Sequence, residues 1–144
     1  MNINLKKLND KAIVPTYGTI ESAGADLYAC LDSDVVIKPN EVVKIGTGVS
    51  VAIPTRYVGL VFARSGLSIR EGLVPANCVG VIDADYRGEI VVALHNYSNE
   101  NRTINHGERI AQLVIVPFLK ANFSIVKELD ETRRGSGGFG STGK

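Results

Sequence analysis

Two aspartates stand two positions apart where the apolar run Val79–Ile82 ends. On an extended segment, positions i and i+2 lie on one face, so Asp83 and Asp85 would share a side and Tyr86 would point to the other, unless the chain turns there. A carboxylate at the edge of an apolar run can orient a water, hold a metal ion or act as a base. The alternative is a hairpin connection formed by Asp-Ala-Asp-Tyr-Arg-Gly.

A second candidate group combines a basic residue, a hydroxyl and a glycine within 63–68. Arg64 offers forked donors, Ser65 adds one more, and Gly66 lets backbone N–H groups approach an anion. The alternative is a solvated arginine followed by a helical turn that Ser65 caps. The stretch predicts either a phosphate cradle or a helix cap.

Two more polar side chains stand among small or apolar neighbours. Asp26 lies within 23–29, where it either caps backbone amides in a turn or takes part in a site. Gln112 lies among aliphatic residues within 107–113, so its amide needs a partner. A core hydrogen bond, an interface and a ligand are all open for Gln112.

The last ten residues, 135–144, include five glycines and no large aliphatic side chain. Such a segment cannot bury itself, and alone it should be a mobile tail. It can still wrap phosphates with backbone N–H groups when it orders on a ligand, and Phe139 could stack on a base. The match of 138–144 to GxxxxGK is not expected to form a P-loop, because neither a helix nor a Ser or Thr follows Lys144 in this sequence.

The elements that must position these residues are short strands. Runs rich in Val, Ile and aromatic residues, punctuated by proline, glycine and asparagine, predict strands within 41–53, 57–62, 89–94, 109–118 and 123–126. One short helical turn is expected after Arg64. This pattern predicts a single all-β domain, a jelly-roll-like sandwich or barrel, followed by the glycine-rich tail.

Composition limits the classes of function. The formal net charge of the 144 residues is +1, which gives no general attraction to nucleic acid or to anionic membranes. Two cysteines and two histidines, with no CxxC pair, do not form the patterns of zinc sites. Free thiols, and the absence of an apolar stretch typical of a signal peptide or membrane span, predict a cytoplasmic protein.

Taken together and in order, five stretches resemble the motifs of the trimeric deoxyuridine triphosphatase (dUTPase) family. They are AGADLYA at 23–29, ARSGLS at 63–68, GVIDADYRGE at 80–89, GERIAQL at 107–113 and RGSGGFGSTG at 134–143. One departure is Ala63, where the family usually has proline. The resemblance implies a homotrimer with three active sites at subunit interfaces, a β-domain over 1–131 and an arm over 132–144 that closes over a neighbour's site.

The resemblance also implies a reaction and roles for residues. The enzyme would hydrolyse dUTP to dUMP and pyrophosphate with Mg²⁺, water attacking the α-phosphorus. Asp83 would be the base that deprotonates this water, and Asp26 would act near Mg²⁺ through its waters. The uracil edge would be read by Asn77 and by the backbone of Gly80, Val81 and Ile82, while Tyr86 would lie against the deoxyribose and reject UTP. The phosphates would be held by Arg64, Ser65, Gly66 and Gln112, with closure by Arg134, Ser136 and Gly137 and stacking by Phe139.

Two alternatives share part of this pattern. A dCTP deaminase of the same fold would need an additional acid–base glutamate beside the pyrimidine, for which the sequence offers no obvious candidate. A nucleotide-binding regulatory module would bind without turnover. Ammonia release from dCTP distinguishes the first alternative, and the effect of Asp83→Asn on turnover distinguishes the second.

Overall fold

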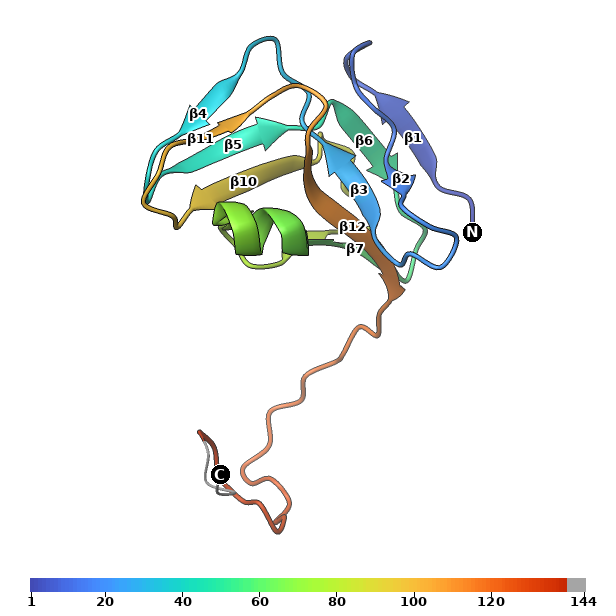
Figure 1. Cartoon of the computed structure of the whole chain (residues 1–144). Coiled ribbons are helices and arrows are strands. Elements are labelled where there is room, and N and C mark those ends of the chain that lie inside the picture. Colours follow the sequence, from blue (N-terminus) through green and yellow to red (C-terminus); the bar gives the residue numbers. More distant parts are fainter. Residues whose placement is uncertain (140–144) are drawn as a thin grey trace.

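The computed structural model describes residues 1–139, and nearly all of its regular structure is β. Figure 1 shows the strands wrapped into one body, from which the C-terminal segment leaves at the end of the last strand. The elements are β1 (Asn4–Lys7), β2 (Thr16–Tyr17), β3 (Ala25–Tyr28), β4 (Val35–Ile37), β5 (Val42–Gly46), β6 (Val49–Ala52), β7 (Tyr57–Phe62), the helical turn η1 (Leu67–Glu71), β8 (Leu73–Pro75), β9 (Gly80–Ile82), β10 (Val91–Asn96), β11 (Arg102–Ile104) and β12 (Arg109–Pro117).

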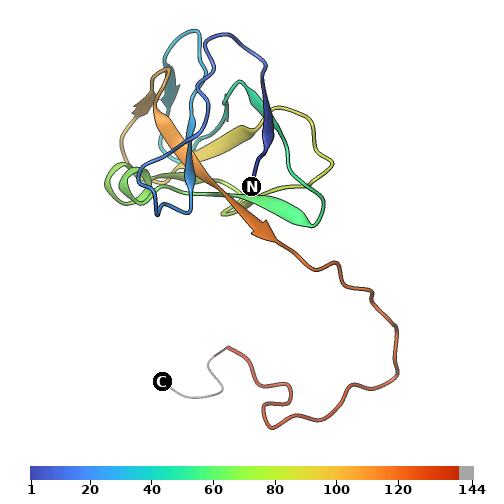
Figure 2. The same cartoon turned by 90° about the vertical axis from the view of Figure 1, so that its right-hand side faces the viewer.

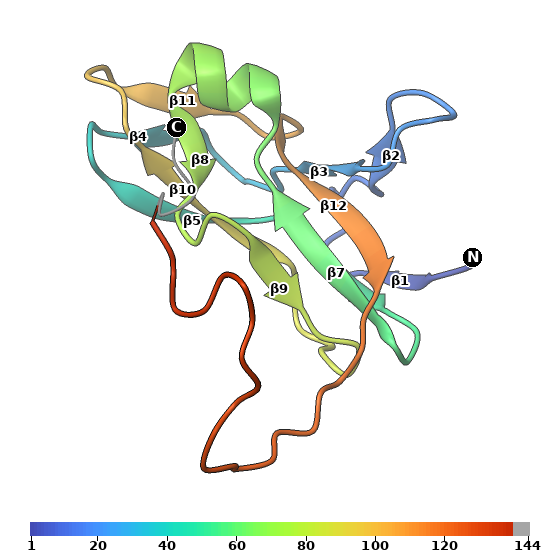
Figure 3. The same ribbon diagram turned by 90° about the horizontal axis from the view of Figure 1, so that it is seen from below.

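The strands form four antiparallel sheets. The largest has the order β2-β3-β12-β7-β9, so β12 lies between β3 and β7, with β9 beyond β7 (Figure 3). The others are β5-β10-β8, β1-β6 and β11-β4. Many neighbours in this order are distant in sequence, as in a jelly roll. The predicted all-β fold is confirmed.

The core is made of aliphatic side chains from all four sheets. Leu27 and Ile110 come from the large sheet, Ile45 and Leu94 from the three-stranded sheet, and Ile37 from β4, all with at most 1% exposure. Burial of such side chains stabilises the fold by roughly 1.5–3 kcal/mol each. A rigid core therefore supports the strand ends where the candidate site residues lie.

Most of the expected strands are confirmed. The run 57–62 is β7, 109–118 contains β12, 89–94 overlaps β10, and 41–53 divides into β5 and β6. The division occurs at Gly48, whose φ of 68° is in the left-handed region that favours glycine. The helical turn expected after Arg64 is η1, a single π-helical turn that ends at Gly72 in the left-handed conformation.

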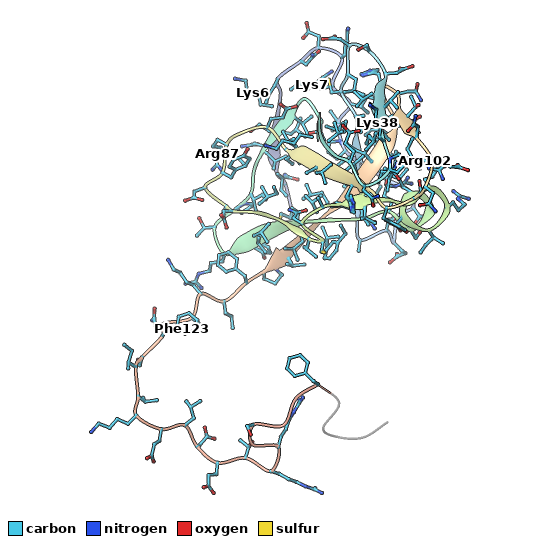
Figure 4. The ribbon with its side chains drawn as sticks, turned by 90° about the vertical axis from the view of Figure 1, so that its left-hand side faces the viewer. Lys6, Lys7, Lys38, Arg87, Arg102 and Phe123 are labelled. Carbon is cyan, nitrogen blue, oxygen red and sulfur yellow. The ribbon has the colours of Figure 1, made fainter. Side chains whose placement is uncertain are left out.

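One expected strand is wrong for the isolated chain: residues 123–126 form no strand. They lie in the segment that follows β12 and leads away from the body, with Phe123 95% and Ile125 104% exposed (Figures 2 and 4). Their β propensity has no effect here because a strand needs a neighbouring edge for its backbone hydrogen bonds, and within residues 1–139 none lies alongside. The boundary at 131 between β-domain and arm stays a prediction.

Candidate functional site

A cleft of about 560 Å³ joins three of the stretches identified from sequence. It is lined by Gly18, Ser22, Ala23, Gly24, Asp26, Arg64, Ser65, Gly66, Arg109, Gln112 and Val114. The sheet register explains this grouping, because Gln112 of β12 stands opposite Asp26 of β3 on one side and Phe62 of β7 on the other. Arg64 to Gly66, directly after β7, therefore lie beside Asp26. We call Arg64, Ser65 and Gly66 the cradle.

The carboxylate of Asp26 lies between two guanidinium groups. Its Oδ1 accepts a hydrogen bond from Nε of Arg64 at 2.7 Å, and its Oδ2 accepts one from Nη1 of Arg109 at 3.3 Å. The side chain of Asp26 is 12% exposed and that of Arg64 24%. A carboxylate so buried requires such partners. Asp26 thus holds two guanidinium groups, those of Arg64 and Arg109, at the cleft. Two positive groups side by side are suited to binding a polyanion.

The sequence did not single out Arg109. Within 107–113 the sequence pattern points to Gln112 alone, as an amide among aliphatic residues. The register of β12 against β3 places it opposite Tyr28, within reach of Asp26. A signal was available, since a basic residue in the same stretch as a predicted phosphate ligand is itself a phosphate ligand candidate.

The amide of Gln112 finds a partner in the backbone and lies against a glycine. Its Nε2 donates to the carbonyl of Ala63 at 2.8 Å. A Cβ added at Gly24 would overlap Oε1 of Gln112. The absence of a side chain at Gly24 therefore makes room for this amide beside the cradle.

The η1 turn holds the cradle from behind. The N–H of Ser68 donates to the carbonyl of Arg64 at 2.9 Å, and its hydroxyl donates to the carbonyl of Ser65 at 3.2 Å. The N-cap of η1 is Gly66, and no side chain caps it. The expected alternative, in which Ser65 caps the helical turn, is therefore not what the structure shows, and Ser65 lines the cleft instead.

Of the candidate base-reading residues, Asn77 lies in the connection between β8 and β9, and Gly80, Val81 and Ile82 form β9. The N–H of Cys78 donates to the carbonyl of Pro75 at 3.0 Å, and Cys78 has a φ of 61°. This tight turn brings Asn77 back toward β9, where a Cβ at Gly80 would lie 3.4 Å from Nδ2 of Asn77. Asn77 and Gly80 are therefore neighbours, as the proposed reading of a nucleobase edge requires.

Asp83 and Tyr86 lie in a braced turn. The N–H of Tyr86 donates to the carbonyl of Asp83 at 3.1 Å, and its hydroxyl donates to the carbonyl of Glu89 at 2.9 Å. Arg87 donates to the carbonyls of Ala84 and Tyr86 at 2.7 and 2.8 Å. The segment is therefore neither extended, as the spacing of the aspartates suggested, nor a hairpin connection, since β9 and β10 belong to different sheets.

This turn borders a second, smaller cleft of about 250 Å³, lined by Val81, Ile82, Asp83, Tyr86, Glu89 and Val91. The cleft is separate from the cradle. Ile82 pairs with Gly59 near the beginning of β7, whereas Arg64 follows the end of β7, five positions further along. At about 3.3 Å per residue, that separation is on the order of 15 Å.

Comparison with known proteins decides the family. The family model described as dUTPase matches residues 10–143. A protein of Nautilia profundicola named deoxyuridine 5'-triphosphate nucleotidohydrolase is 49% identical over the whole of both chains. One of the same name from Desulfotalea psychrophila is 52% identical over 130 residues, which cover 90% of this chain and 87% of the relative. The chain belongs to the dUTPase family.

Solved dUTPase structures have the same fold. A mutant dUTPase of Staphylococcus bacteriophage 80alpha with dUpNHpp is 33% identical and superposes with a TM-score of 0.89, covering 99% of both chains. A mutant dUTPase of phage phi11 of S. aureus, described with a structural Mg(II) ion, is 29% identical with a TM-score of 0.82, covering 91% of this chain and all of that one.

Within one chain of this dUTPase, the structure does not bring the residues of the C-terminal segment to the cradle that they are expected to close. Arg134, Ser136, Gly137 and Phe139 lie on the segment that leads away from the body (Figures 1 and 2). Nε of Arg134 donates to the carbonyl of Gly137 at 2.9 Å, and Phe139 is fully exposed. The rest of the fifth motif, 140–143, lies outside the described residues, as does most of the GxxxxGK match.

The shifted pKa values of this dUTPase lie away from the cleft. Burial raises the pKa of the Cys30 thiol, so that thiol stays protonated and a poor nucleophile. On the surface, the hydrogen bond from Lys11 lowers the pKa of Asp32. Within residues 1–139, no group of three or more His, Cys, Asp or Glu side chains is placed to hold a metal ion, and no helix is long and apolar enough to cross a membrane.

Proposed function

We propose that this chain hydrolyses dUTP to dUMP and pyrophosphate, with water attacking the α-phosphorus. This reaction keeps uracil out of DNA and supplies dUMP for thymidylate synthesis. One observation carries the proposal: the cleft in which Asp26, Arg64, Ser65, Gly66 and Gln112, drawn from three family motifs, are assembled by the register of one sheet.

The phosphates bind in the cradle. Arg64 supplies fixed charge, and Arg109 adds a second guanidinium on the other side of Asp26. Ser65 contributes its hydroxyl, and Gly66 allows close approach of the backbone. Positioning and neutralisation of charge supply most of the catalysis in phosphoryl chemistry, and this set of donors is suited to both.

The nucleoside binds at the β8–β9 connection and at the second cleft. Asn77 and the backbone of Gly80, Val81 and Ile82 complement the O4 acceptor and N3 donor of uracil. Tyr86 lies against the deoxyribose, and its ring leaves no space for a 2′-hydroxyl. The hydrogen bond from Tyr86 to the carbonyl of Glu89 supports this role because it fixes the ring.

Asp83 is the general base. Its carboxylate holds a single water and accepts its proton as that water attacks, a role typically worth about 10²–10⁴-fold in rate. The turn that carries Asp83 is fastened to the body, since Oγ of Ser50 donates to the carbonyl of Arg87 at 2.7 Å. A base on a fixed turn keeps its distance to the water constant.

The donor set fits a magnesium ion that arrives with the triphosphate. Both oxygens of Asp26 already accept hydrogen bonds from arginines, which leaves lone pairs for waters of the ion and not a closed protein site. When bound, Mg²⁺ neutralises the phosphate charge and sets the conformation of the chain of phosphates. Asp26 would contact it through water.

The complete site is formed by three subunits. Asp83 and Arg64 lie near opposite ends of β7, a separation on the order of 15 Å, which argues against one chain applying both to the same α-phosphate. A homotrimer solves this: one subunit contributes the cradle, a second contributes Asp83 and Tyr86, and a third closes the site with residues 132–144. The free thiols of Cys30 and Cys78 are in keeping with an intracellular enzyme.

Pyrophosphate release from dUTP, UTP, dCTP and dTTP, with and without Mg²⁺, tests the activity. We expect turnover of dUTP alone and no ammonia from dCTP. In the same assay, Asp83→Asn should lose most turnover and keep dUTP binding, while Asp85→Asn, a matched change in the same turn, should stay close to wild type. Intact dUTP after incubation of pure protein with Mg²⁺ would refute the proposal.

Mixing of variants tests the shared site. Asp83→Asn and Arg64→Ala should each be nearly inactive alone. After the two are unfolded and refolded together, mixed trimers contain some sites with an intact Asp83 and an intact Arg64, so activity should return to a measurable fraction of wild type. Absence of any recovery, with trimers present by light scattering, would mean that one chain supplies both residues.

A further inference from the structure

We propose that Tyr97 is a positioning residue for the phosphate cradle and acts through Ser68. The inference rests on the proposed role of Arg64, Ser65 and Gly66 in binding phosphates. Tyr97 lies outside all five motifs, directly after β10. Within residues 1–139 its hydrogen bonds go to Ser68 and Gly72 and not to the cradle, so its effect passes through these partners.

Ser68 is the link between Tyr97 and the cradle. Three of its polar groups are engaged with defined partners. Its N–H donates to the carbonyl of Arg64, its hydroxyl donates to the carbonyl of Ser65, and its own carbonyl accepts from the hydroxyl of Tyr97. A shift of the Ser68 backbone would therefore move the backbone of two cradle residues, Arg64 and Ser65.

Tyr97 holds the η1 turn at two points. Besides the bond from its hydroxyl to Ser68, its N–H donates to the carbonyl of Gly72 at 2.9 Å. The next residue, Ser98, packs so closely on Gly72 that an added Cβ there would lie 2.8 Å from Cβ of Ser98. Both ends of the single turn are thus fixed to one short segment after β10.

That segment is itself rigid. Asn96 is completely buried, and its Nδ2 donates to the carbonyls of Ile37 and Glu100 at 2.9 and 2.8 Å. Its Oδ1 accepts from the N–H and the hydroxyl of Ser98. Buried amides with all partners satisfied fix a local conformation. Tyr97, which follows the buried Asn96, therefore fixes the position of η1 relative to the core.

The η1 turn needs such support because it contributes no buried side chain of its own. π-Helical turns are rare in proteins, and those that occur are often found near functional sites. Segments with few buried contacts open locally at low free energy. The hydroxyl of Tyr97 therefore stabilises η1 in place of buried side chains. It does so at Ser68, the residue of η1 that is hydrogen-bonded to the cradle.

Tyr97→Phe removes this hydroxyl and keeps the ring. We expect kcat/KM for dUTP to fall about three- to tenfold, as for loss of one hydrogen bond that positions a ligand group. The affinity for dUpNHpp should fall by the same factor, while that for dUMP, which has one phosphate, should fall less. The control is Tyr57→Phe, at the beginning of β7 and far from Arg64, with wild-type values expected.

A second variant tests the route through Ser68. Ser68→Ala removes the bond to Ser65, so Tyr97→Phe should have a smaller effect in that background than in wild type. Equal loss of dUpNHpp and dUMP affinity, full additivity of the two changes, or unchanged kinetics in Tyr97→Phe would each overturn the inference. A wild-type dUpNHpp affinity in Arg64→Ala would instead overturn the cradle, which separates the two failures.

Discussion

Asp26 and Arg64 are joined by a 2.7 Å hydrogen bond between Oδ1 and Nε, although 38 positions separate them in sequence. The bond uses the inner nitrogen of the guanidinium, and Nη1 of Arg64 makes only a long contact of 3.4 Å with the carbonyl of Arg109. Within residues 1–139, Nη2 of Arg64 makes no hydrogen bond, so it remains available to a ligand in the cleft that Arg64 lines. We therefore expect the carboxylate to serve first to orient Arg64 toward a phosphate, with contact to magnesium waters as a second role.

Asp26→Asn should lower kcat/KM for dUTP by about 10- to 100-fold, because the neutral amide replaces charge-assisted hydrogen bonds to two arginines. We expect most of the loss as a rise in KM, which steady-state kinetics at saturating Mg²⁺ would measure. Asp32→Asn is the control, since it breaks an exposed ion pair with Lys11 and should change neither parameter. A loss confined to kcat at low Mg²⁺ would favour a role toward the metal alone.

Gly24→Ala should displace the amide of Gln112, because the new methyl group overlaps Oε1. We expect kcat/KM to fall about tenfold and the free energy of unfolding to fall by about 1–3 kcal/mol, measured by denaturant titration. Gly18→Ala is matched: it borders the same cleft, and its Cβ would meet only Oγ of Ser22 at 3.7 Å. Similar effects of both changes would argue against specific contact with Gln112.

Residues within one motif were found from the sequence, whereas contacts between motifs were not. The residue types of Arg64, Ser65 and Gly66 leave a phosphate cradle and a helix cap open; the three residues line the cleft, and phosphate binding there stays a prediction. The ion pair of Arg109 with Asp26 depends on which position of β12 faces which position of β3, with a register shift between Arg109 and Ala111. No local pattern encodes a register between strands more than 80 positions apart.

The same limit explains the misreadings of strands. The propensity of 123–126 for β structure is real, but propensity forms a strand only where a neighbouring edge is available. On an extended segment the two aspartates would share a face, but the chain turns at Tyr86, the exception that the sequence left open. That turn is stabilised by Ser50 of another strand, a contact that the motif does not contain.

Tyr86→Ala should weaken the preference for dUTP over UTP by at least about tenfold, because the ring no longer occupies the space of a 2′-hydroxyl. Competition assays with both nucleotides would measure the ratio. Tyr86→Phe is the matched control: it keeps the ring and loses only the bond to the carbonyl of Glu89, so the preference should fall much less than in Tyr86→Ala. An unaltered ratio in Tyr86→Ala would place the sugar elsewhere.

Deletion of all residues after Glu131 should leave a folded trimer with strongly reduced activity. Residues 132–139, the described part of the deleted segment, lie away from the β body within the chain, so thermal unfolding should be nearly unchanged (Figure 4). Turnover should fall because Arg134 and the glycine-rich strip no longer cover the phosphates, which admits additional water.

Phe139→Ala separates loss of stacking from loss of phosphate closure. Stacking of an aromatic side chain contributes roughly 1–3 kcal/mol per base in proteins that bind single-stranded nucleic acid, so its loss alone should raise KM and leave kcat largely intact. Wild-type kinetics in the truncated protein would show that the cradle and Asp83 suffice without closure.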